Sequence, residues 1–159
     1  MNTYLTPYHL MQGIADAMRN VFKDVRMGDD RQQLVNVFEQ ALPISTSADD
    51  VPEFAPYCVV RVIDGSISEA NGVETVNTLL LFCVISDRLD MQAYADVLHL
   101  IQMAKECLLE HPIIAKAFYI VAESVQWTLQ QEESHPYYLG GITISYHAPA
   151  IIRNEVDYD

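Results

Sequence analysis

Apolar side chains recur at helical spacing in two stretches of the chain. After Thr6, a favourable N-cap followed by proline, they return every three or four positions, which predicts a helix over residues 7–25. The same spacing follows Asp90 and stops at a His-Pro dipeptide, which predicts a second helix over residues 91–110. We expect each helix to lay one apolar stripe on a sheet.

Five other segments have the alternation or the β-branched composition of strands. We predict strands over residues 35–41, 57–63, 73–86, 118–130 and 137–147. The third is apolar on both faces, which predicts a central strand covered on both sides. Asp-Gly and Asn-Gly turn signals lie within residues 64–72, so the second and third strands are expected to form a hairpin with an extended tip. Gly140-Gly141 indicates a bulge or the close approach of another backbone.

The expected element order is α-β-β-β-α-β-β. Two helices on a largely antiparallel sheet form an α+β layer fold. The chain has 159 residues and shows no linker or internal repeat, so we expect one domain over residues 1–159. Its acidic end, residues 148–159, is expected to be loosely held.

The formal charge of −13 comes from 22 acidic and nine basic residues, and it is unevenly spread. Residues 43–75 carry six acids against Arg61, and residues 122–159 carry six acids against Arg153. Direct binding to a nucleic-acid backbone needs a basic footprint, so this distribution disfavours it. Taken alone, the acidity also fits a role in solubility. No window reaches the apolar length of a membrane span, so no membrane association is expected.

No residue pattern indicates catalysis, a cofactor or a metal. Cys58, Cys83 and Cys107 are far apart and have apolar neighbours, which is typical of reduced core thiols. The paired acids Asp49-Asp50 and Glu132-Glu133 lie in polar segments, where solvated carboxylates are common. No phosphate-binding glycine loop and no nucleophile elbow occur. The five histidines are not spaced as metal ligands usually are. They are His9, His99, His111, His135 and His147.

Two blocks of sequence carry a resemblance to a known family. Residues 54–65 read FAPYCVVRVIDG, and residues 127–141 run from a W-x-L motif to HPYYLGG. With the order of helices and strands around them, they resemble the small tail-terminator or tail-completion proteins of long-tailed bacteriophages and prophages. The resemblance extends over most of residues 5–153.

The resemblance implies a virion structural protein rather than an enzyme. Such proteins pack helices against a curved sheet and close into homo-oligomeric rings, typically hexamers. The ring caps the tail tube, stops its growth and meets the head-neck connector, while DNA passes through without specific binding. It implies a place in the virion tail, and in the host cytoplasm during assembly. Ring closure needs a heterologous contact, for which the long apolar strand and the 64–72 tip are candidates.

Carboxylates that line a channel would repel passing DNA and keep it from adhering. The acids proposed for such a channel or interface are Asp49, Asp50, Glu53, Asp64, Glu69 and Glu74.

Two alternatives remain open at this point. Another head-tail connector or neck protein would share small size, acidity and ring assembly. A small-ligand or regulatory domain, or an enzyme with an unrecognised site, predicts instead a well-formed pocket with convergent polar groups.

Overall fold

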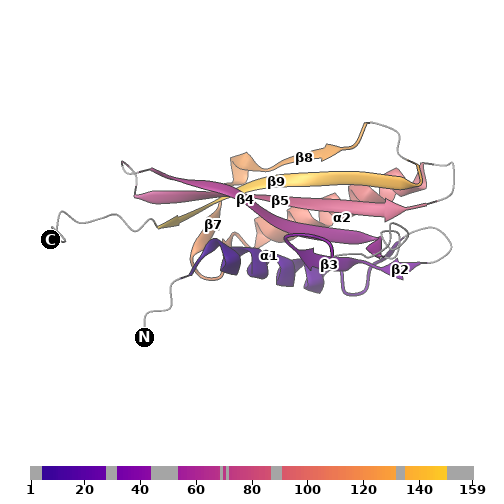
Figure 1. Ribbon diagram of the computed structural model, residues 1–159, viewed down its shortest axis with the longest axis horizontal. Helices are drawn as coiled ribbons and strands as arrows, with labels where there is room; N and C mark the ends of the chain where they lie inside the picture. The colour runs from indigo at the N-terminus through magenta and orange to yellow at the C-terminus, as the bar shows by residue number, and fades with distance from the viewer. Residues whose placement is uncertain are drawn as a thin grey trace.

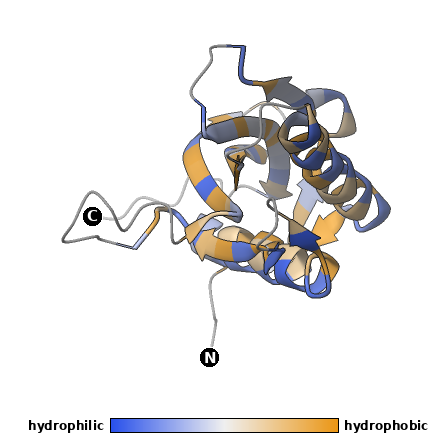
Figure 2. Ribbon diagram, turned by 90° about the vertical axis from the view of Figure 1, so that its right-hand side faces the viewer, coloured by the Kyte–Doolittle hydropathy of each residue, from blue (hydrophilic) through white to orange (hydrophobic). Residues whose placement is uncertain are grey.

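A seven-stranded mixed sheet forms the centre of the computed structural model, with both α-helices on one of its faces (Figures 1 and 2). The structure describes residues 5–27, 32–43, 54–68, 70, 72–86, 91–131 and 135–149. The helices are α1 (Pro7–Val21) and α2 (Gln92–Glu110), with a short 3-10 helix η2 (Ala122–Ser124). The strands are β1 (Arg26–Met27), β2 (Gln33–Leu34), β3 (Asn36–Glu39), β4 (Tyr57–Ser68), β5 (Val73–Ile85), β6 (Ile113–Ile114), β7 (Phe118–Ile120), β8 (Gln126–Leu129) and β9 (Tyr137–Pro149). The predicted α+β class is confirmed.

Both predicted helices are present. Thr6 caps α1 as expected: its hydroxyl accepts from the Tyr8 N–H at 3.3 Å, and its own N–H donates to His9 Nδ1 at 3.0 Å. The helix ends at Val21 rather than at residue 25, because the chain then turns into β1, which pairs with β2 in a separate two-stranded ladder. The second helix keeps nearly its predicted bounds.

The strand order is β3-β4-β5-β9-β7-β6, and β8 also pairs with β9. Only β3 and β4 run parallel; every other pair is antiparallel. The prediction of a single strand over residues 118–130 is wrong, because η2 divides it into β7 and β8. Ser124 holds this break against β9: its hydroxyl accepts from the Ser145 N–H at 2.8 Å.

The predicted hairpin of the second and third strands is confirmed, but its first strand is longer than expected. Asp64 and Gly65 do not form a turn; β4 continues through them to Ser68. A register shift between Val62 and Asp64 marks a β-bulge, after which the strand pairs regularly with β5. Most of the 64–72 tip is therefore paired strand. Next to the tip of this hairpin, β9 includes Ala148 and Pro149, and the rest of the expected acidic tail lies outside the described residues.

The central strand β5 has one covered and one open face. Alternate residues that face the helices are buried: Val76, Thr78, Leu80, Phe82 and Val84. The prediction that β5 is central is confirmed. Both helices pack on the same face, so among the described elements no helix covers the opposite one, and the expected cover on both sides is wrong. We call this opposite face, seen from the front in Figure 1, the outer face.

Candidate functional site

Beyond the last paired residues of β3 and β4, a side chain takes the place of strand backbone. The last paired residues are Glu39 and Val60. Beyond them the Gln40 side-chain amide donates to the Val62 carbonyl at 3.2 Å and accepts from the Val62 N–H at 3.1 Å. Gln40 reaches this position with a left-handed φ of 67°, and Arg61 Nε donates to its carbonyl at 2.8 Å. Gln40 thus acts as a one-residue continuation of β3.

Past Val62, the side of β4 that faces away from β5 is open. Residues 63–68 are all exposed, and no described strand pairs with them on that side. Ile63 and Ile67 are 54% and 57% exposed, which is high for large apolar side chains in a strand. We call residues 63–68 the β4 edge. In Figure 1 this end of the hairpin projects past the helices at the left of the view.

The opposite side of the same sheet also ends in an open strand. Strand β8 pairs with β9 on one side, and no described strand pairs with its other side. Its first three residues are exposed, and Trp127 is 48% exposed. We call Gln126–Leu129 the β8 edge. The β8 edge is level with residues 58–61 of β4, where the order is β4-β5-β9-β8, so it lies on the opposite side of the sheet from the β4 edge and is displaced from it along the strands.

A row of polar side chains crosses the outer face beside the β4 edge. Asn77 Nδ2 donates to Asp64 Oδ1 at 2.6 Å, and Ser145 Oγ donates to Asn77 Oδ1 at 2.6 Å. These residues and Ser124 line a shallow hollow of about 440 Å³. Because they bond one another across β4, β5 and β9, much of their hydrogen-bonding capacity is used within the sheet. The row holds three strands together, and a role for it needs no ligand.

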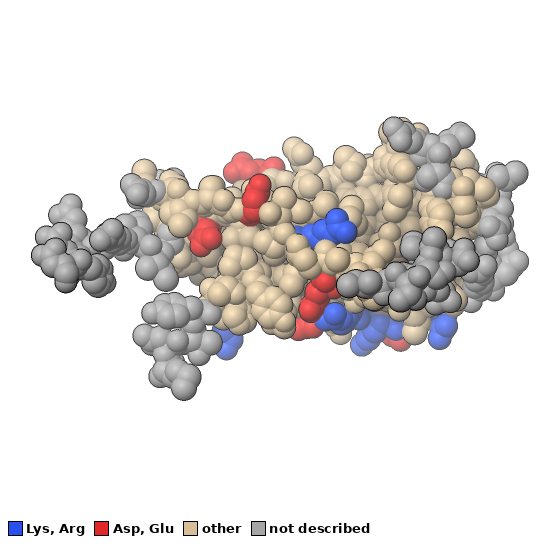
Figure 3. All heavy atoms as spheres, viewed as in Figure 1, with Lys and Arg blue, Asp and Glu red and all other residues tan. Residues whose placement is uncertain are grey.

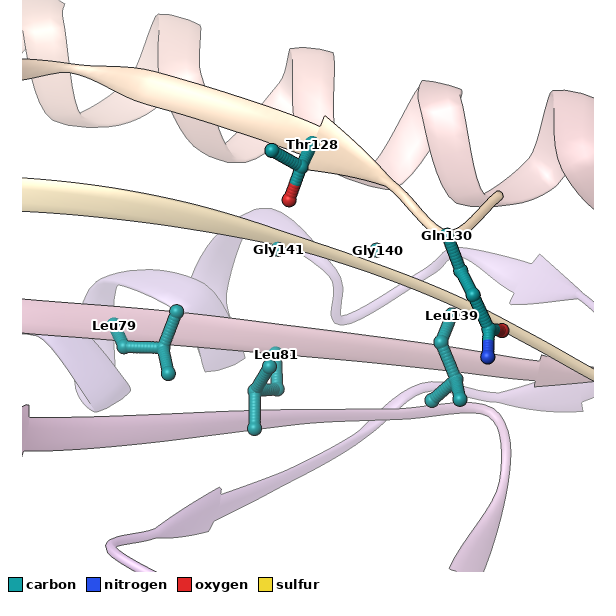
Figure 4. A pocket seen from close by; sticks show the side chains of 7 residues that line it. All are labelled: Leu79, Leu81, Thr128, Gln130, Leu139, Gly140 and Gly141. Carbon is teal, nitrogen blue, oxygen red and sulfur yellow. The ribbon is translucent and has the colours of Figure 1, made fainter. Parts of the chain in front are cut away.

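A cluster of leucine side chains lies beside this polar row on the outer face. Leu79 and Leu81 of β5 and Leu139 of β9 surround a hollow of about 230 Å³, together with Thr128, Gln130, Gly140 and Gly141 (Figure 4). A Cβ on Gly141 would lie 3.5 Å and 3.6 Å from the nearest methyl carbons of Leu81 and Leu79, so the glycine leaves space between them. Figure 3 views the outer face and shows few charged side chains on it.

The structure describes two of the six predicted acids, and it places them on opposite faces. Asp64 pairs with Asn77 and shares the outer face with it. Glu74 is an odd number of residues from Asn77 along β5, so its side chain points to the other face, beside that of its partner Ile67. The other four acids, Asp49, Asp50, Glu53 and Glu69, lie outside the described residues.

The described segments hold no cluster of metal-binding side chains, and their cysteines are free thiols. Within those segments, no three His, Cys, Asp or Glu residues lie close enough to share a metal ion. The three cysteines are free thiols, as predicted. Burial raises the pKa of Cys83 to about 11 and raises the pKa of Cys58 further, so both are protonated thiols at neutral pH.

Three of the five histidines take part in helix caps or in a side-chain contact within the fold. His9 belongs to the α1 capping box, and His135 Nδ1 lies 3.0 Å from the Tyr138 hydroxyl. His111 is the C-cap of α2, in keeping with the structural break predicted there. Across the described ranges, no helix has the length and apolar character needed to cross a membrane.

Sequence reasoning identified the hairpin tip but missed both open edges. The role of Gln40 depends on a contact with Val62, 22 positions away, and no local pattern indicates it. The β8 edge was hidden within one long predicted strand. Its signal was the Ala-Glu-Ser segment before Gln126, a short polar stretch that interrupts the alternation.

The comparisons with known proteins find no relative by sequence, and similarity appears only among solved structures. No protein-family model matches the chain, and no curated protein matches it. Among solved structures, the fold is similar to a chain described as "Virion of native gene transfer agent (GTA) particle", with a TM-score of 0.41 and 8% sequence identity. The alignment covers 92% of this chain and 97% of that one. A likeness at this level identifies no family.

Proposed function

We propose that this chain is a virion structural protein of a long-tailed phage or prophage, acting as a tail terminator or tail-completion protein. Copies assemble into a ring that caps the tail tube and joins it to the head-neck connector. The observation that carries the proposal is the pair of open edges on opposite sides of one sheet. A subunit with two different open edges associates head to tail, and such heterologous contacts form a ring when the rotation between copies closes.

The sequence blocks that resemble the terminator family support the proposal by their position. Residues 54–65 lead into β4 and reach the β4 edge, and residues 127–141 contain most of β8 and the start of β9. Both blocks also supply residues of the inner strands β4 and β9, and each block reaches one of the two open edges. This is where residues that govern contacts between subunits are expected.

The acidity of the chain gives the ring a second property. With a charge of −13 per copy, a ring concentrates negative charge around its opening. DNA passing through such an opening is repelled by the wall, which favours passage over adhesion. Asp64 is the first described acid to test for this role, because it is exposed and lies in the projecting hairpin.

The proposal is tested by mixing purified protein with tail-tube subunits from the same genome and following tube length by electron microscopy. We expect tubes to stop lengthening and to end in a ring of this protein. Unchanged tube growth and bare tube ends at excess protein would contradict a terminator role. Binding to the head-neck connector with no effect on tube growth would identify a neck protein instead.

A further inference from the structure

The two open edges lack the features that usually keep strand edges apart. Natural edge strands are protected by lysine, proline, bulges or a covering element. The β4 edge reads IDGSIS and the β8 edge reads QWTL, with no lysine, arginine or proline in either. One bulge lies at the start of the β4 edge, between Val62 and Asp64, and residues 64–68 after it pair regularly with β5. Both edges therefore present regular strand backbone for pairing.

Charge also favours these edges as the place where copies meet. Two copies that each carry −13 repel one another, so they approach best through surface with few charges. The ten residues of the two edges include one charged side chain, Asp64. Its carboxylate already accepts from Asn77 at 2.6 Å, so part of its charge is compensated within the subunit.

The strand order restricts which edges can meet. The β4 edge pairing with itself would be isologous and would stop at a dimer. Strand β3 lies on the same side of the sheet as the β4 edge, so it is not on the side that a head-to-tail contact would bring to the β4 edge. On the other side, β6 has two residues and β8 has four. Among the described strands on that side, β8 alone offers the β4 edge a partner of useful length.

We propose that copies of this chain join by strand addition, with the β4 edge of one copy paired antiparallel to the β8 edge of the next. This rests on the proposed function in one respect, namely that the copies form a ring. The direction follows from the sheet: β4, β5, β9 and β8 alternate in direction, so a sheet continued in the same sense places β8 antiparallel to β4. Backbone hydrogen bonds give the contact its strength, as in other cases of strand addition.

Side chains on the helix-facing side add specificity to this pairing. Ile67 shares that side with its partner Glu74, and Trp127 shares it with its partner Ile142, which is fully buried. In the joined sheet, Ile67 and Trp127 lie on the same side of neighbouring strands. An aromatic and a β-branched residue form a favourable cross-strand pair. Both side chains are about half exposed in the single subunit, and the contact would bury them.

Cross-linking between copies tests the geometry directly. The full chain carrying Cys107→Ala, to remove the partly exposed thiol, receives Ile67→Cys and Trp127→Cys together, and is treated with a short bis-maleimide after ring assembly on tail tubes. We expect a ladder of covalent multimers. Each single cysteine variant serves as a control and should remain uncross-linked. Efficient dimer formation by Ile67→Cys alone would show that β4 edges pair with each other, and would overturn the proposal.

Charge substitutions test the energetics. Ile67→Glu and Trp127→Glu should each abolish ring formation, because each places a carboxylate in the joint. Leu98→Glu on α2 is the matched control, since Leu98 is 37% exposed and the change in net charge is the same. Far-UV circular dichroism confirms that each variant is folded. If all three variants form rings and the double cysteine variant gives no ladder, the joint lies elsewhere while the proposed function stands. If the unmodified protein forms no ring on tubes, both fail.

Discussion

The neighbouring glycines of β9 differ in what they face, and this gives a sharp prediction. A Cβ on Gly140 would lie 2.8 Å from Val97 Cγ1 and 3.0 Å from Ile101 Cδ1, both on α2, and 3.1 Å from the Thr128 carbonyl oxygen of β8. Val97 is fully buried and its χ1 is restricted in a helix, so it cannot move aside. Gly140 therefore sets how closely α2 packs on the sheet, and the close approach at this glycine is made mainly by α2 side chains rather than by the other backbone that the sequence predicted.

The expected cost of Gly140→Ala follows from these contacts. Forcing a methyl group into a well-packed core costs about 1–3 kcal/mol. Replacing glycine by alanine recovers about 0.4–1 kcal/mol by restricting the unfolded chain. We therefore expect the free energy of unfolding to fall by about 1.3 kcal/mol, the middle of a range from roughly 0 to 2.6 kcal/mol. For a protein of this size, each kcal/mol lowers Tm by about 2–4 °C.

Gly141→Ala is the matched control, because it adds the same methyl group one residue away on the outer face. There the Cβ would lie 3.1 Å from the Leu80 carbonyl oxygen and make ordinary contacts with two leucine side chains that border open space. We expect its stability to stay within about 0.5 kcal/mol of the unmodified protein. Urea unfolding followed by far-UV circular dichroism measures both variants. Equal stability of the two would refute the proposed role of Gly140 in packing α2.

Three further predictions concern stability and use the same assay. Gln40→Ala removes both hydrogen bonds to Val62 and should lower the free energy of unfolding by roughly 1–3 kcal/mol. Gln40→Gly should lower it less, because glycine accepts the left-handed φ of 67°. Equal losses for the two variants would show that the backbone at Gln40 is not strained. Tyr146→Phe should leave stability equal or higher, because the buried Tyr146 hydroxyl has no hydrogen-bond partner within the described part of the chain; a clear loss would reveal one. Stability should fall as pH rises from about 9 towards 11, because burial raises the pKa of Cys83 to about 11 from its ordinary 9.0 and the thiol ionises more readily once unfolded; a flat profile would contradict this.

The sequence predicted the elements whose pattern is local. Both helices follow from the apolar spacing after Thr6 and Asp90, and the central position of β5 follows from its continuous apolar composition. The hairpin was predicted correctly, but its first strand was ended too early, at residue 63 instead of Ser68. The Asp-Gly signal at residue 64 is a local preference, and pairing with β5 along the whole strand overrides it.

What could not be predicted depends on contacts between distant residues. The break between β7 and β8 is held by the bond from Ser145 to Ser124, 21 positions away. The face on which Asp64 lies depends on the bulge after Val62, because one extra residue reverses the alternation of every residue that follows. For this reason the sequence could name Asp64 and Glu74 as candidates but could not show that they point to opposite sides.

The register of the sheet has a consequence for the shape of any assembly joined at its edges. Through β9 and β5, the β8 strand lies level with residues 58–61 of β4, whereas the open stretch begins at residue 63. A second copy attached there is therefore displaced along the strand direction by about five residues, or about 17 Å. Across the sheet, perpendicular to the strands, it is displaced by four strand spacings, or roughly 19 Å. If the displacement along the strands is absorbed by a tilt, they incline at about 40° to the axis and the circle closes level. If the strands do not tilt in this way, successive copies are displaced along the axis and form an open helical filament.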